Sequence, residues 1–128
     1  MYVVAFFAFA FGAAIGLTMA VLHARGKKSG KALGIAHGLF TVSGLVLLAV
    51  GMWQAEAGPA WWILVAFLVT AAGGAYLFSK QAKDEPWPGA VIVAHGALAV
   101  VSLVALGLWL TDVPEPPADD PVEEAREG

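Results

Sequence analysis

Four long apolar runs dominate the chain, and each is long enough to cross a membrane. They cover residues 2–22, 31–53, 59–79 and 88–110. A hydrocarbon core of about 30 Å is crossed by about 20 apolar residues in a helix. Open strands would leave backbone groups unpaired in lipid, so we expect every run to be helical. The predicted fold class is an all-α membrane protein with four transmembrane helices.

The composition narrows the range of functions. Hydrophobic residues make up 59% of the 128 positions and charged residues 13%, which is too apolar for a soluble domain of this length. The chain has no cysteine, which excludes disulfides, iron–sulfur clusters and thiolate metal sites. No basic residue precedes the first apolar run, so we expect that run to be retained as a span and not cleaved as a signal peptide.

An internal repeat organises the apolar runs. Residues 10–52 align with residues 68–110 at a constant offset of 58, and this register pairs His37 with His95 and Gly38 with Gly96. Each repeat unit contains two antiparallel spans, so both units enter the membrane in the same direction. We therefore expect two tandem helical hairpins related by a pseudo-twofold axis along the membrane normal.

The repeat also gives the domain boundaries that we predict. A four-helix transmembrane bundle is expected over residues 1–111, with repeat one at 1–53 and repeat two at 59–111. Residues 112–128 contain seven acidic residues, four prolines and one arginine, which favours a disordered acidic tail. This tail would either dock a basic partner or serve only to keep the chain soluble.

The distribution of basic residues predicts the orientation. Six of the 7 lysines and arginines lie between the first and second spans or between the third and fourth spans, whereas Glu56 is the one charge between the second and third. Positive charge favours the cytoplasmic side, so these two basic loops are expected inside and both termini outside. The chain would then be a multi-pass protein.

Two histidines lie within the otherwise apolar spans. His37 follows Lys31 by six residues and His95 follows Pro88 by seven, which puts them about 9 and 10 Å along their helices. An ionisable side chain in a bilayer is costly, so it should face the bundle interior, and it indicates a functional site. The span cores contain no acidic or basic partner, so both imidazoles are expected to be neutral.

Two neutral imidazoles on parallel helices can supply both axial ligands of one haem b. We predict that His37 and His95 are metal ligands of a haem held between the second and fourth spans. Gly34, Gly38 and Gly96 are predicted to line the cofactor, because small residues let a flat group approach the helices.

Other interpretations of these residues stay open at this stage. The histidines could instead hydrogen-bond across the helix seam, and the glycines could serve only helix packing. His23 is expected to be interfacial, although a site in which all three histidines bind one metal is also compatible with the sequence.

Two stretches carry a resemblance to known proteins. They read AHGLFTVSGLVLLAVGMW at residues 36–53 and AHGALAVVSLVALGLWL at residues 94–110. This pattern resembles small four-helix bacterial inner-membrane proteins, which implies the same location. His37 and His95 also give the chain a resemblance to minimal b-type cytochromes, membrane bundles whose haems are held by paired histidines. That second resemblance implies haem b and electron transport.

The function that we predict is that of a b-type cytochrome-like electron carrier with one haem. The alternative is a non-haem structural or accessory subunit of a larger membrane complex. A transporter or channel would need a polar path, for which the spans offer only histidines and scattered hydroxyls. We can assemble no nucleophile and base pair or carboxylate dyad from the spans, so at most the chain transfers electrons.

The expected partners are the lipid bilayer and a redox or membrane protein, with a quinone and a second copy of the chain as further candidates. Nucleic acid is excluded, because the few basic residues are placed at the membrane surface.

Overall fold

The computed structural model describes residues 1–54, 58–59 and 61–112. These form four α-helices, α1 (Tyr2–Ala24), α2 (Lys31–Gln54), α3 (Trp61–Ala82) and α4 (Gly89–Asp112). All four are long and apolar enough to cross a membrane, which confirms the predicted all-helical fold with four candidate spans. Except for Asp112, the segment predicted to be a disordered acidic tail lies outside the described residues.

The helices extend past several of the predicted boundaries. The third apolar run was predicted to end at Ser79, but α3 continues to Ala82. Lysine, glutamine and alanine are good helix formers, so helical hydrogen bonding continues after the apolar run has ended. As a result Gln81 belongs to a helix and is only 8% exposed.

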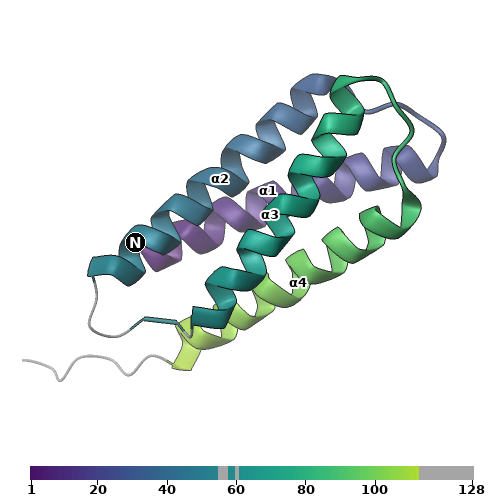
Figure 1. Ribbon diagram of the computed structural model, residues 1–128. Helices are drawn as coiled ribbons and strands as arrows, with labels where there is room; N and C mark the ends of the chain where they lie inside the picture. Colours follow the sequence, from purple (N-terminus) through teal and green to yellow (C-terminus); the bar gives the residue numbers. More distant parts are fainter. Residues whose placement is uncertain (55–57, 60, 113–128) are drawn as a thin grey trace, which may run out of the picture.

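The two short loops end their helices with the same cap geometry. A residue with left-handed φ follows each helix, namely Gly26 at 68° after α1 and Asp84 at 54° after α3. The N–H of the next residue then donates to the carbonyl five residues earlier, at 2.9 Å in both loops. This is the hydrogen bonding of a Schellman cap. Both loops lie at the end of the bundle opposite the N terminus (Figure 1).

The four helices are arranged around a central interior. Backbone contacts join α1 to α2, α2 to α3, α3 to α4 and α4 to α1. Among the described residues α2 makes no backbone contact with α4, nor α1 with α3, so each of these pairs lies diagonally across the bundle (Figure 1). Side chains on α2 and α4 can therefore meet only at the centre.

The half of the bundle farther from these loops is closely packed. The rings of Phe9 and Phe67 stack at 3.9 Å with an interplanar angle of 6°. Leu48 and Leu106 are fully buried beside them, at 0% exposure. This apolar core closes one end of the interior, whereas the half nearer the loops contains the cavities described below.

Large apolar side chains cover the outside of the bundle. Leu39, Val93 and Leu108 are 65%, 70% and 61% exposed. An apolar surface of this extent is far larger than a soluble monomer normally exposes. The surrounding medium that suits it is lipid, as expected for a multi-pass membrane protein.

The buried residue Leu48 allows the contribution of the core to the stability of the bundle to be tested. Leu48→Ala should destabilise the bundle by about 2 kcal/mol, which is at the low end of the range for buried leucines. The loss is small because the separated helices remain in lipid, so burying the side chain does not transfer it out of water. Denaturation in mixed detergent micelles, followed by circular dichroism, would measure the change. Leu108→Ala is the matched control, since Leu108 is 61% exposed on the outside of the bundle. Equal loss in both variants would contradict the assignment of the core.

Candidate functional site

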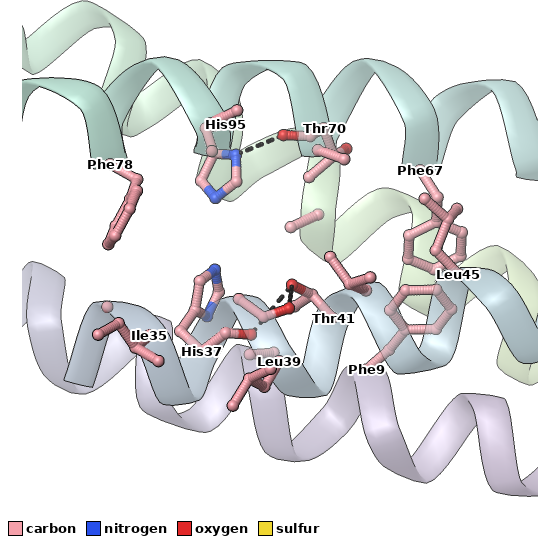
Figure 2. Close-up of a pocket in the computed structure, with 18 of the residues that line it drawn as sticks. Phe9, Ile35, His37, Leu39, Thr41, Leu45, Phe67, Thr70, Phe78 and His95 are labelled. Carbon is pink, nitrogen blue, oxygen red and sulfur yellow. Dashed lines mark hydrogen bonds between the residues drawn. The ribbon is translucent and has the colours of Figure 1, made fainter. Parts of the chain in front are cut away.

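The two intramembrane histidines meet at the centre of the bundle. His37 comes from α2 and His95 from α4, and their rings face one another across the interior (Figure 2). The ring centroids lie 6.1 Å apart with an angle of 73° between the planes. Both side chains are half-buried. The residues that the repeat pairs in sequence are therefore neighbours in space.

Each imidazole is held by a backbone carbonyl of a neighbouring helix. Nδ1 of His37 lies 2.7 Å from the carbonyl oxygen of Gly12, and Nδ1 of His95 lies 2.9 Å from that of Thr70. A carbonyl oxygen can only accept, so Nδ1 must be the protonated nitrogen in both rings. In the neutral imidazole the lone pair then lies on Nε2.

The free nitrogens point toward one another. Figure 2 shows the second nitrogen of each ring directed at the opposite histidine. No described residue makes a hydrogen bond to Nε2 of His37 or His95. Two lone pairs that face each other repel, so the space between them favours a positively charged group, either a metal ion or a proton. Histidines that bind metals characteristically donate their other N–H to a carbonyl or a carboxylate, as these two do.

Two glycines allow the imidazoles to reach the backbone. Gly16 and Gly74 each lie four residues after the accepting residue, on the same face of the helix. A Cβ at Gly16 would lie 2.9 Å from Cε1 of His37, and a Cβ at Gly74 would lie 3.0 Å from Cε1 of His95. Any side chain at these positions would push the ring away from its carbonyl.

Gly16 and Gly74 were not among the residues predicted for the site. The available signal was their place one helical turn after Gly12 and Thr70, at positions separated by the same offset of 58. This spacing can be interpreted only after the structure shows that the histidines bond to the carbonyls of Gly12 and Thr70.

Two apolar cavities flank the histidine pair. The first has a volume of about 430 Å³ and is lined mainly by α2 and α3, with Phe9 and Phe67 at its closed end. The second has a volume of about 280 Å³ and is lined mainly by α1 and α4. His37 and His95 line both of them. The facing nitrogens therefore have apolar space on both sides.

The glycines predicted to line a cofactor lie on these cavities. Gly38 lines the first cavity, Gly96 the second, and Gly34 both. A Cβ at Gly38 or Gly96 would meet no atom within 4 Å, so these positions border open space. Gly34 differs, because a Cβ there would overlap with Oε1 of Gln81. The small size of Gly34 is thus already required by its contact with Gln81.

His23 takes no part in the central pair. It is exposed, and its ring packs against that of Trp87 at a centroid distance of 5.4 Å. Across the described ranges no group of three or more histidine and acidic side chains is placed to share a metal ion. The three-histidine site that the sequence left open is therefore not formed, and His23 lies at the surface, at the loop end of the bundle.

None of the family models, curated proteins and solved structures with which the chain was compared matches it.

Proposed function

We propose that this chain is an integral membrane protein that binds one haem b through Nε2 of His37 and His95 and carries electrons. The observation that supports the proposal is the pair of imidazoles fixed by their Nδ1 hydrogen bonds, with both lone pairs directed at one point. The polar groups that hold each ring lie on a neighbouring helix, so the arrangement does not depend on a bound group.

The spacing of the rings suits a metal between them. A metal–imidazole bond is about 2 Å long, and an imidazole ring with bonds near 1.35 Å has a radius of roughly 1.15 Å. If both nitrogens bind one metal in line, the two ring centroids lie about 6.3 Å apart. The observed separation is 6.1 Å. The separation of the rings is therefore compatible with a metal held between the two Nε2 atoms.

The surrounding space suits a flat apolar group. A haem held by these two nitrogens would need apolar space beside the histidine pair, and the two cavities lie on either side of that pair. Volumes of about 430 and 280 Å³ together fall within the range of about 300 to 1,000 Å³ typical of cofactor sites. A bare metal ion would leave this space unexplained.

The residues of this chain would give the site its properties. The Gly12 and Thr70 carbonyls fix the tautomer and the direction of each ring, and they strengthen Nε2 as an electron donor. The stacked rings of Phe9 and Phe67 exclude water from one side. When bound, haem supplies a one-electron iron couple whose potential depends on these ligands and on burial.

The proposed pseudo-twofold repeat is supported by equivalent contacts at an offset of 58. Gly12 and Thr70 accept from equivalent histidines, and buried Leu48 corresponds to buried Leu106. The stacked phenylalanines and the residues with left-handed φ in the two caps are also equivalent pairs. We further propose a bacterial inner membrane location, with the basic loops inside and both termini outside.

An optical spectrum tests the function directly. The full chain, expressed in haem-replete cells and purified in mild detergent, should show a Soret band and the sharp α and β bands of a reduced six-coordinate haem. His23→Ala should leave the spectrum unchanged, since His23 lies at the surface against Trp87.

Two results would count against the proposal. Colourless protein that also fails to take up added haemin would favour the accessory-subunit alternative, particularly if a larger membrane protein copurifies. Colourless protein that contains a stoichiometric transition metal would show that the histidines hold a bare ion.

A further inference from the structure

A third cavity lies at the loop end of the bundle. It has a volume of about 390 Å³, and residues of both loops line it. Its lining includes three lysines and two acidic residues, and it is therefore more polar than that of the two cavities at the histidines. It shares Gln81 and Trp87 with the α1 and α4 cavity, so the polar and apolar spaces adjoin at these two residues.

Acidic side chains neutralise part of the positive charge around this loop cavity. Lys31 Nζ lies 3.5 Å from a carboxylate oxygen of Asp84, and Lys80 Nζ lies 2.6 Å from one of Glu85. The hydrogen bond from Lys80 lowers the pKa of the Glu85 carboxyl below its usual value. Glu85 therefore stays ionised, and Lys31 and Lys80 are already paired.

Lys27 and Lys28 remain as cations that line the loop cavity. Within the described residues neither of them forms an ion pair. Both residues are exposed, so their ammonium groups are available to an anion that binds at the cavity. Lysine is a common ligand of phosphate and carboxylate groups, which it attracts as a point charge.

Gln81 provides a second, independent indication of a ligand. Its side-chain Nε2 donates to the Ser29 and Gly30 carbonyls at 3.2 and 3.4 Å. Its Oε1 is buried, with no hydrogen-bond partner in the described structure. A buried acceptor without a donor is destabilising. Oε1 lies against Gly34, so the amide has to rotate before a hydroxyl on a ligand head group can donate to this oxygen.

We propose that the loop cavity is a separate binding site for the anionic oxygen head group of an amphiphile whose apolar part occupies the adjoining α1 and α4 cavity. The head group is a phosphate or a carboxylate, held by Lys27 and Lys28. In a phospholipid such as phosphatidylglycerol, a head-group hydroxyl beside the phosphate would donate a hydrogen bond to Oε1 of Gln81. Two sources have this chemistry, namely an anionic phospholipid and the carboxylates of a haem bound at the histidines. The second source rests on the proposed function and the first does not.

The test compares two double variants of the full chain that lose the same charge. Lys27→Gln/Lys28→Gln alters the cavity, whereas Arg25→Gln/Lys83→Gln alters basic residues of the same loops that do not line it. In the lipid arm, native mass spectrometry measures retention of phosphatidylglycerol against phosphatidylcholine from equimolar mixed micelles. In the haem arm, Soret titration compares haemin with haemin dimethyl ester, which has no free carboxylates.

The cavity variant should lose roughly ten-fold or more in preference for the anionic ligand, because two direct charge-assisted contacts are lost. The matched control should change much less, because Arg25 and Lys83 do not line the cavity. Selective loss in the lipid arm assigns the site to phospholipid, and selective loss in the haem arm assigns it to haem carboxylates. Gln81→Leu should weaken phosphatidylglycerol, because the acceptor for its head-group hydroxyl is removed.

Equal loss in the two double variants would overturn the proposal, because a general surface potential would then explain the binding. Absence of any anion preference in both arms would overturn it as well. If the protein takes up no haem at all, the proposed function fails, and the phosphatidylglycerol comparison alone decides whether the loop cavity is a site.

Discussion

Replacing either central histidine by alanine is expected to abolish stable haem binding. His37→Ala or His95→Ala removes one axial ligand and leaves the opposite Nε2 facing an empty space. The affinity should fall by more than about 100-fold, beyond the ten- to hundred-fold cost typical of losing a residue that only orients a ligand. Titration of the purified variants with haemin, read from the Soret band, measures this loss.

Rescue by free imidazole makes the histidine test more stringent. Alanine leaves a space of imidazole shape next to the carbonyl of Gly12 or Thr70, so added imidazole should restore the six-coordinate spectrum in either variant. His23→Ala is the control that removes a histidine from the surface without touching the pair. Unchanged haem affinity in both alanine variants would eliminate the proposed ligands.

Adding a single methyl group behind each imidazole should also weaken the site strongly. In Gly16→Ala the new Cβ would lie 2.9 Å from Cε1 and 3.1 Å from Nδ1 of His37, so the ring has to shift and its hydrogen bond to the Gly12 carbonyl is expected to weaken. We expect a loss of ten- to a hundred-fold in haem affinity, the magnitude typical of losing an orienting partner. Gly74→Ala should behave alike, because its Cβ would lie 3.0 Å from Cε1 of His95.

A control variant at another glycine separates displacement of the imidazole from the general effect of replacing a helical glycine by alanine. A Cβ at Gly89, in the first turn of α4, meets no atom within 4 Å, so Gly89→Ala should leave both affinity and melting temperature nearly unchanged. The spectrum of the Gly16 variant gives a second measurement, since a displaced ring should convert part of the haem to a five-coordinate form. Wild-type affinity in both glycine variants would show that the Nδ1 hydrogen bonds do not position the ligands.

The sequence determined the secondary structure and the class of the protein. Apolar runs of about 20 residues leave the backbone no alternative to helices in lipid, so the four spans could be located to within a few residues. The runs did not locate the end of α3, because Lys80 and Gln81 continue the helix without adding to its hydropathy. The constant offset between the repeats also predicted that His37 and His95 lie at one depth.

The tertiary structure decided what the two histidines can do. Hydropathy and spacing fix the position of a residue along a helix but not the rotation of the helix about its axis, which depends on packing against the neighbours. That rotation brings the Gly12 and Thr70 carbonyls to Nδ1 of the two rings and leaves both Nε2 atoms directed at each other. It also gives Gly16 and Gly74 a role and places Gln81 between the loop cavity and the apolar interior. These relations join residues of different helices, and no local pattern in the sequence encodes them.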